Sequence, residues 1–354
     1  MAVLAPAVAA VRVAVRRALV GLPGSGPVLV ACSGGADSLA LAAATAFVAP
    51  RLGRAAGLVT VDHGLQTGSA ERAAAVARWA ERTGLGPVES VRVRVAGRPG
   101  GPEAAAREAR YQALAEAGRR YGASALLTGH TRDDQAETVL LALARGAGPR
   151  GLAGMPPRRD LSGVPLLRPL LDVSREQTRR ACAALGLTPW EDPHNVDPSY
   201  ARARVRSDVL PVLVAALGPG VLDNLARTAR LVAADTAVLD DLAADALAAA
   251  RVPTGGPAGA RAEAGGDGPG AGGAAGGRPD GGGLVVAVLA GLAPAVRTRV
   301  LHAWAREVGA PAAALSYRHV AALDALVTDW RGQGAVHLPG ALRVTRRDGH
   351  LVPA

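Results

Sequence analysis

The feature that most constrains this chain is a short apolar run that leads directly into a glycine loop and then into a helical stretch. Residues 28–32 are apolar, and the loop at 33–38 has the sequence SGGADS. Its two glycines let the backbone approach an anion closely, and Ser33 and Ser38 add hydroxyl donors. A helix that begins here points its N-terminal amides and its dipole at the same place. The segment predicts a phosphate-binding loop, although a helix start capped by Asp37 or Ser38 would explain it without a ligand.

A divalent cation is predicted at the same loop. Asp37 lies among groups that attract phosphate, and its carboxylate would repel that phosphate unless a cation bridged the two. Mg²⁺ is the natural choice, because it is a hard ion that prefers oxygen ligands.

Strand-like and helical segments alternate over residues 1–150. Apolar runs predict strands at 28–32, 57–62, 88–95 and 124–129. Helices are predicted at 1–20, 38–48, 68–83, 103–121 and 133–145. Such alternation predicts an α/β fold with a doubly wound parallel sheet, in which ligands bind at the carboxyl ends of the strands.

The composition changes after residue 150. A turn-rich connector leads into helices predicted near 174–185, 203–216 and 221–249. Residues 252–283 are almost entirely Gly, Ala and Pro, and a segment with so little apolar surface to bury is predicted to be a disordered insertion. From residue 284 the sequence again predicts structure, namely two helices and a hairpin that turns near Gly340.

The composition also excludes several classes of protein. All 40 Lys and Arg residues are arginines, so no motif that needs a catalytic or phosphate-binding lysine is present. The two cysteines, Cys32 and Cys182, form no CxxC pair and no disulfide framework. The sequence shows neither an apolar run of membrane-spanning length nor a secretory signal, so a cytoplasmic protein without membrane contact is expected.

The net charge is compatible with a nucleic-acid partner. The 40 basic residues exceed the 30 acidic residues and give a formal net charge of +10. Such a surplus favours a polyanion, because each phosphate that it neutralises releases condensed counterions. A solvated basic surface explains the same charge equally well, so both interpretations stay open.

Two further strand ends carry polar residues suited to nucleotide chemistry. Asp62 and His63 follow the second predicted strand and could contact ribose or adenine, although a capped turn is the simpler explanation. After the fourth strand, His130 precedes Asp134 and Glu137, which lie three apart and share a helix face. An acidic first turn, favoured by the helix dipole, would explain the acids without chemistry.

Arg107 and Arg110 share a face of the preceding helix and are followed by Tyr111. Two arginines beside a nucleotide could hold a leaving pyrophosphate. A solvated helix face is the alternative for both, and it is the better explanation for Arg107.

The order and spacing of these motifs resemble a known family. The loop SGGADS resembles the PP-loop of the N-type ATP pyrophosphatases, which split ATP into AMP and pyrophosphate. The set as a whole is similar to the bacterial tRNA(Ile)-lysidine synthetases over residues 25–250 and again near 332–340. Two departures from the family pattern are His194 and Ala203. The motifs that carry the resemblance are SGGADS, VDHGL, EAAAREARYQAL, GHTRDDQAETVLLALARGAGPRGLAGM, RPLL, WEDPHNVD and RARVR.

The resemblance implies a two-step reaction. ATP adenylates the C2 oxygen of the wobble cytidine in the CAU anticodon of tRNA(Ile), and the ε-amino group of L-lysine then attacks C2 and expels AMP. The resemblance thus implies a carbon–nitrogen ligase whose substrates are ATP, L-lysine and tRNA, with Mg²⁺ as cofactor. A homodimer is compatible with the sequence.

The residues and the resemblance together give a set of expected site residues. The ATP-binding residues are Ser33, Gly34, Gly35, Ala36, Asp37, Ser38, Asp62, His63 and Gly129. The catalytic residues are Asp37, Arg110, His130, Asp134 and Glu137, with Asp37 as the metal ligand. Asp134 and Glu137 are expected to bind lysine, and Asn195, Arg202 and Arg206 to bind tRNA.

The residue patterns and the resemblance also predict the domains. They are a leading helix at 1–20, a PP-loop catalytic domain at 21–200, a helical tRNA-contacting region at 201–251, the insertion at 252–283 and a helical and hairpin region at 284–354.

Three alternatives fit the sequence less well. A PP-loop thiolase, which places sulfur at C2 of a pyrimidine, generally needs catalytic or cluster-binding cysteines, and the two isolated cysteines argue against it. GMP and asparagine synthetases need a glutaminase, and no nucleophilic N-terminal cysteine or GxCxG motif is present. A non-catalytic RNA-binding protein with a vestigial nucleotide fold is disfavoured, because every polar position of the loop is filled.

Overall fold

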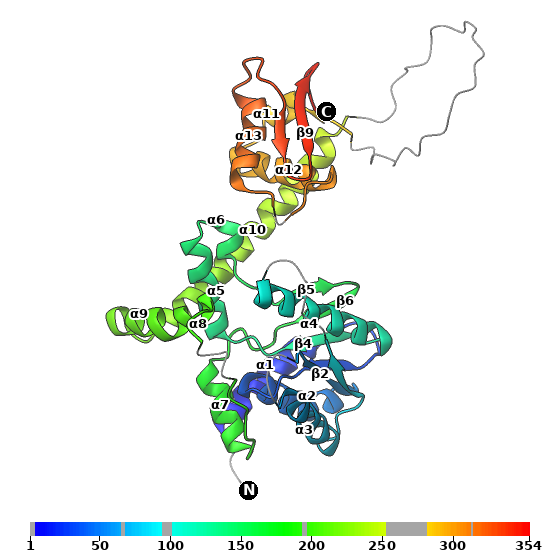
Figure 1. Ribbon diagram of the computed structural model, residues 1–354, viewed down its shortest axis with the longest axis vertical. Coiled ribbons are helices and arrows are strands. Elements are labelled where there is room, and N and C mark those ends of the chain that lie inside the picture. The colour runs from blue at the N-terminus through cyan, green and yellow to red at the C-terminus, as the bar shows by residue number, and fades with distance from the viewer. Residues whose placement is uncertain (1–3, 65–67, 94–100, 193–196, 253–281, 313) are drawn as a thin grey trace, which may run out of the picture. The chain divides into compact units, whose positions relative to one another are not determined.

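The computed structural model describes residues 4–64, 68–93, 101–192, 197–252, 282–312 and 314–354 (Figure 1). The chain divides into two compact units, Met1–Ala233 and Ala234–Ala354, and each is described by itself. Apart from its ends, the insertion predicted at 252–283 lies outside the described residues.

The first unit is built on a six-stranded sheet with the strand order β3-β2-β1-β4-β6-β5. All neighbouring strands are parallel except β5, which pairs antiparallel with β6 at the sheet edge. The predicted parallel α/β sheet is therefore confirmed. The strands are β1 Val28–Ala31, β2 Ala56–Asp62, β3 Val88–Arg92, β4 Ala125–Thr128, β5 Arg158–Leu161 and β6 Val164–Leu167.

Helices cover both faces of this sheet, as a doubly wound fold requires. One core lies between the sheet and α1, α2, α3 and α7, and it includes Val15, Leu41 and Cys182. On the other face α4 packs through Tyr111 and Leu114. The helices are α1 Pro6–Leu19, α2 Ala36–Arg51, α3 Ser69–Arg82, α4 Gly101–Arg120, α5 Arg132–Ala144, α6 Gly148–Leu152 and α7 Arg175–Ala184.

One prediction for the first unit was wrong, and one element was missed. The single helix expected at 203–216 consists of α8 (Ala201–Arg204), a π-helical turn (Val205–Val209) and α9 (Leu210–Leu217). The interruption precedes Pro211, which lacks an amide hydrogen and cannot continue the α-helical hydrogen-bond series. The β5–β6 hairpin was not predicted, because β5 is a polar edge strand without an apolar run.

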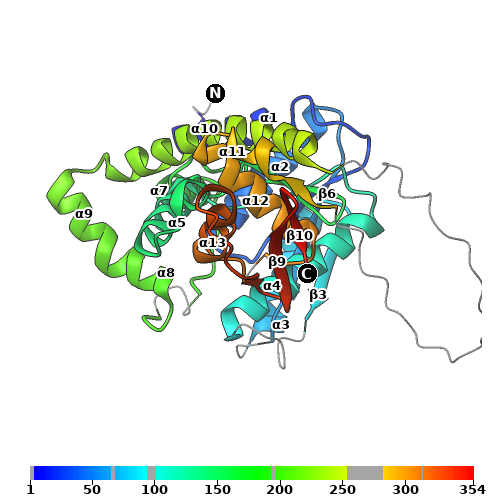
Figure 2. The same ribbon diagram turned by 90° about the horizontal axis from the view of Figure 1, so that it is seen from above.

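The second unit combines helices with a small antiparallel sheet in the order β7-β10-β9-β8, against which α13 packs (Figures 1 and 2). Its core contains the buried Trp304 and also the last turns of α10. The predicted hairpin is confirmed as β8–β9, and Gly340 adopts a φ of +83° beside Pro311. α10 spans Val221–Ala250, and its residues up to Ala233 belong to the first unit. The other elements of the second unit are β7 Leu284–Val285, α11 Val286–Ala290, α12 Pro294–Glu307, α13 Tyr317–Thr328, β8 Val336–Leu338, β9 Leu342–Arg347 and β10 His350–Pro353.

The two sides of the Gly/Ala/Pro-rich segment are joined by backbone pairing. The amide of Val252 donates to the carbonyl of Gly283 at 2.9 Å, and Arg251 forms a bridge with Leu284. We expect that replacing residues 253–281 with a short Gly-Ser linker leaves the melting temperature largely unchanged, because loop closure depends only weakly on loop length. Thermal unfolding and tRNA affinity of the deletion variant check this. A large loss of tRNA affinity would show that the segment contacts RNA.

Candidate active site

The glycine loop joins β1 to α2 and leaves the start of that helix without a side-chain cap. Gly35 is the N-cap residue, and no side chain accepts a hydrogen bond from the first amides of α2. The Ser38 hydroxyl instead donates to the carbonyl of Gly35 at 2.9 Å, and it accepts from the amide of Ser33 at 3.2 Å. The capped helix start that was the alternative explanation is thus not what forms here. Uncapped amides at a helix start are suited to a phosphate group.

Gly129 brings the end of β4 against the start of α2. A Cβ atom on Gly129 would lie 3.0 Å from the backbone carbonyl of Asp37 and 3.1 Å from the amide nitrogen of Ser38. Backbone atoms cannot move aside as a flexible side chain can, so a larger residue would push the loop away from the sheet. Gly129 therefore positions the glycine loop.

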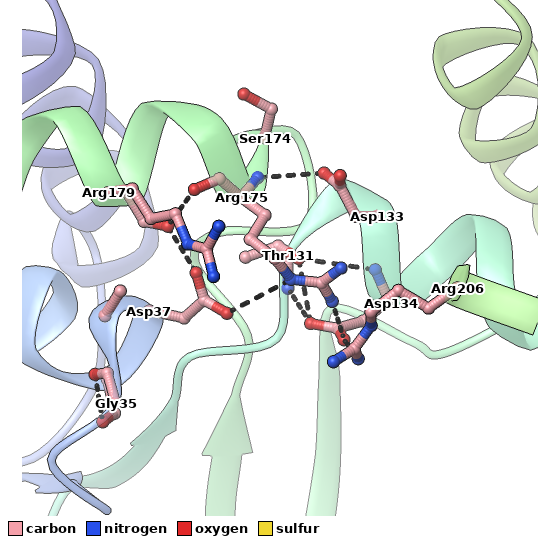
Figure 3. A network of polar contacts seen from close by, with 12 residues as sticks. Gly35, Asp37, Thr131, Asp133, Asp134, Ser174, Arg175, Arg179 and Arg206 are labelled. Atoms are coloured by element: carbon pink, nitrogen blue, oxygen red, sulfur yellow. Dashed lines mark hydrogen bonds and ion pairs between the residues drawn. The ribbon is translucent and has the colours of Figure 1, made fainter. Parts of the chain in front are cut away.

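Asp37 lies in the first turn of α2 and faces α7 (Figure 3). Its Oδ1 accepts a hydrogen bond from the hydroxyl of Thr178, and its Oδ2 lies 3.8 Å from Nε of Arg175. Burial raises the pKa of Asp37 to about 6, and the nearby Asp134 carboxylate adds to that rise. The carboxylate is held at the phosphate loop in an environment where a cation would be favourable.

Arg175, at the first position of α7, is the centre of the polar network in Figure 3. Its side chain contacts Oδ1 of Asp134 at 2.9 Å and Oε1 of Glu137 at 3.2 Å, and its backbone amide donates to Asp133 at 2.9 Å. Burial alone would lower the pKa of Arg175, but the surrounding carboxylates raise it above its ordinary value. Arg175 therefore stays charged and links α7 to α2 and α5.

Asp134 closes a capping box at the start of α5. Its Oδ2 accepts from the amide of Thr131 at 2.8 Å, while the Thr131 hydroxyl caps the amide of Asp134. Burial alone would raise the pKa of Asp134, but Arg175 and the Thr131 amide hold it below its ordinary value. The acidic first turn expected as an alternative does form, but its cap is Thr131 and not Asp133. The other carboxylate oxygen of Asp134, Oδ1, still faces Arg175.

Glu137 is fully buried and surrounded by arginines. Its carboxylate contacts Arg175, Nε of Arg206 at 2.8 Å and Nη1 of Arg202 at 3.7 Å. Arg206 belongs to the π-helical turn, a type of irregularity often found at functional sites. In this structure Arg202 and Arg206, expected as tRNA contacts, are joined to Glu137, the expected lysine ligand. Both roles stay predictions.

His130 is a neutral imidazole at the end of β4. Its Nδ1 lies 3.0 Å from the hydroxyl of Thr128. Burial lowers the pKa of His130 to about 3, and Arg110 contributes to the decrease although Asp134 opposes it. A neutral ring can accept or donate a hydrogen bond but does not add a positive charge.

The second predicted nucleotide motif is partly a turn. Oδ1 of Asp62 accepts from the amide of Gly64 at 2.8 Å, as a capped turn requires. The neighbouring His63 has a buried Nδ1 without a hydrogen-bond partner among the described residues, and burial lowers its pKa. His63 therefore retains a polar atom for a ligand, whereas Asp62 is occupied by the loop.

The structure thus brings most of the predicted residues together around α2, α5 and the carboxyl edge of the sheet. Asn195 lies outside the described residues. Arg175 and Thr178 were missed, because nothing in their helical sequence distinguishes them from neighbouring polar residues. The only local signal was the capping box of Ser174 and Gln177, which fixes where α7 begins.

Among the described residues, no group of three or more His, Cys, Asp or Glu side chains is arranged to hold a metal ion. The part of the chain that the structure describes also contains no single helix long and apolar enough to cross a membrane. The bent pair Ala201–Leu217 and Val221–Ala250 meets that requirement by length and composition only.

The fold and the glycine loop define a PP-loop protein. Residues 12–213 match the family model of the PP-loop domain, and residues 284–352 match that of the TilS substrate binding domain. A solved structure of the U34-tRNA thiolase NcsA from Methanococcus maripaludis is similar in fold, with a TM-score of 0.52 and 20% identity over 64% of this chain and 80% of that chain.

More similar relatives define the family within this class. A tRNA(Ile)-lysidine synthase from Salinispora arenicola is 72% identical over 99% of this chain and 97% of its own length. One from Streptomyces coelicolor is 48% identical over 98% of each chain. The chain belongs to the tRNA(Ile)-lysidine synthase family.

Proposed function

We propose that this protein is a carbon–nitrogen ligase that uses ATP to join L-lysine to C2 of the wobble cytidine in the CAU anticodon of tRNA(Ile). One observation supports the proposal most directly in a chain of this family. Asp37 lies directly at the uncapped glycine loop, and Arg175 links its carboxylate to that of Asp134. The modified tRNA would read AUA instead of AUG and carry isoleucine instead of methionine. A cytoplasmic location and a homodimer are part of the proposal.

The first step needs a site for the ATP phosphates. The start of α2 offers backbone amides, and Ser33 offers a hydroxyl group beside them. The Ser38 hydroxyl would first have to leave the carbonyl of Gly35, to which it donates here. The C2 oxygen of the cytidine attacks the α-phosphorus and pyrophosphate leaves, which gives an O-adenylated base. Amides that are fixed before the reaction stabilise the charge that develops on the phosphates.

Asp37 is the residue that would hold Mg²⁺. One carboxylate is enough, because Mg²⁺ in such sites keeps several waters and shares substrate phosphate oxygens. The ion would neutralise charge on the polyphosphate. Its binding would favour the ionised form of Asp37, whose pKa is raised to about 6 without it.

The second step needs a site for lysine. Its ammonium group would be attracted to the Asp134 carboxylate, which is now satisfied by Arg175 and Thr131. Glu137 shares Arg175 with Asp134, and its carboxylate contacts three arginines in all. After one proton is lost, the ε-amino nitrogen attacks C2 and AMP leaves. Asp134 is the group that could receive that proton, because burial lowers the pKa of His130 to about 3 and leaves its ring a weak base.

The second unit is proposed to bind the body of the tRNA. On the β9 strand, Arg343 and Arg347 are exposed, whereas Arg346 donates to the carbonyl of Leu326 at 3.0 Å and contacts Trp330. We expect that changing Arg343 and Arg347 together to Gln weakens tRNA binding and makes its salt dependence less steep, because phosphate contacts are lost. ATP affinity should not change. An unaltered salt slope in tRNA titrations would contradict this placement.

The test of the proposed function is direct. The enzyme is incubated with ATP, labelled lysine and total tRNA, and label in the tRNA together with released pyrophosphate is the expected result. A reaction without ATP is the control. A non-catalytic RNA-binding protein would release no pyrophosphate, and a thiolase would leave the tRNA without labelled lysine.

A further inference from the structure

Four arginines surround Tyr111 on the side of the sheet covered by α4. The guanidinium carbons of Arg159, Arg107 and Arg110 lie 4.4, 5.0 and 5.2 Å from the centroid of the Tyr111 ring. Arg168 is 4% exposed, its Nη1 donates to the carbonyl of Pro156 at 2.6 Å, and its charge helps to lower the pKa of the Tyr111 hydroxyl. We call Arg107, Arg110, Arg159 and Arg168 the Tyr111 cluster.

The Tyr111 cluster has positive charge without matching negative charge. Among residues whose side chains the structure describes, none of its four arginines forms an ion pair with a carboxylate. The Nε atoms of Arg159 and Arg168 are buried and have no hydrogen-bond partner among the same residues. Burying a guanidinium without a counterion is costly, so an arrangement of this kind is suited to an anion that neutralises it.

The neighbouring groups respond to this charge. Burial alone would raise the pKa of Tyr111, but the four arginines together hold it below its ordinary value. Burial lowers the pKa of Arg110 and of Arg168, and Arg107 adds to both decreases although Tyr111 opposes them. The structure therefore supplies an anion-attracting environment rather than a set of satisfied salt bridges.

The Tyr111 cluster adjoins the candidate active site. Arg168 directly follows β6, which runs parallel to β4 with Leu127 opposite Leu167. Arg168 thus lies at the same carboxyl edge of the sheet as His130, and it contributes to the lowered pKa of that histidine. The strand order β1-β4-β6 places Arg168 beyond β4 from the glycine loop that follows β1.

We propose that the Tyr111 cluster binds a phosphate group of one of the two polyanionic substrates, most favourably an RNA phosphodiester next to the reacting nucleotide. The inference rests on the proposed function for the identity of those substrates. The RNA backbone is favoured over the leaving pyrophosphate expected for Arg107 and Arg110, because the glycine loop already supplies a phosphate site two strands away. Arginine is suited to this ligand, since its planar guanidinium matches phosphate oxygens in pairs.

The test compares Arg159→Gln and Arg168→Gln with Arg119→Gln. Arg119 is a matched control, because it is an exposed arginine of α4 that contacts the β5–β6 turn at the carbonyl of Ser162. Affinity for tRNA is measured without ATP over a range of salt concentrations, and affinity for ATP is measured without tRNA. We expect each variant of the Tyr111 cluster to bind tRNA about tenfold more weakly, because one charge-assisted contact is lost. The salt dependence of tRNA binding should become less steep, and the affinity for ATP should not change.

The outcomes separate the sources of the phosphate. Weaker ATP binding with unchanged tRNA binding would assign the phosphate to ATP and still support the anion site. Folded variants that bind both ligands like the control would overturn the proposal and leave the Tyr111 cluster as a structural stack. If Arg168→Gln does not fold, the same measurements are made on Arg159→Gln and on Arg107→Gln, which replaces an exposed residue. Wild-type enzyme that binds tRNA but incorporates no lysine would contradict the proposed function without affecting this inference.

Discussion

Replacing Asp37 with alanine is expected to reduce tRNA-dependent pyrophosphate release by about 10²-fold or more, the usual cost of removing an electrostatic stabiliser of the transition state. Asp37 is the carboxylate placed in the first turn of α2, directly at the uncapped glycine loop. Without it, the loop has no anionic side chain to hold a cation against the polyphosphate. The measurement is single-turnover pyrophosphate release with saturating ATP and tRNA.

The matched control is Thr178→Val, which removes the hydroxyl group bonded to Asp37 but keeps the carboxylate. This variant should lose less activity, because its effect is limited to one hydrogen bond to a carboxylate, worth about 2 kcal/mol. Raising the Mg²⁺ concentration should not rescue Asp37→Ala. Near-normal pyrophosphate release by Asp37→Ala would contradict the assignment of Asp37 as the cation ligand.

The central part of the fold was predictable because its signals are local. The apolar runs of β1 and β4 are buried strands, and the glycine loop follows β1 as the sequence indicates. Gly129 was expected in the nucleotide site because of the motif around it. Its physical role, a close approach to the backbone of Asp37, depends on two strands that are distant in sequence and is visible only in the structure.

The arginine network was not predictable, because several arginines of α7 are equivalent in sequence. Arg175 contacts Asp37, Asp134 and Glu137, whereas Arg179 pairs with Glu191 and Arg180 pairs with Glu176 at the surface. Which arginine faces the site depends on how α7 packs on α1 and α2. The β5–β6 hairpin was missed for a similar reason: a polar edge strand is stabilised by its neighbour and not by its own pattern.

These contacts give Glu137 a role in stability that its position in the sequence does not reveal. A glutamate expected to bind lysine is fully buried, with Arg175, Arg202 and Arg206 around its carboxylate. These arginines come from α7, α8 and the π-helical turn, so Glu137 holds three segments against α5. Any test of its role in lysine binding must therefore separate lost stability from lost affinity.

We expect Glu137→Gln to lower the free energy of unfolding by about 3 kcal/mol, because removing one partner of a buried ionic network leaves the remaining charges uncompensated. The control is Glu176→Gln, whose partner Arg180 is exposed, and a surface pair of that kind contributes only about 0.5 kcal/mol. The midpoint of urea unfolding, followed by circular dichroism, distinguishes the two. Equal midpoints for Glu137→Gln and the wild type would show that the three arginines find other partners. Glu137 would then not be needed for stability, and lysine binding would be its remaining proposed role.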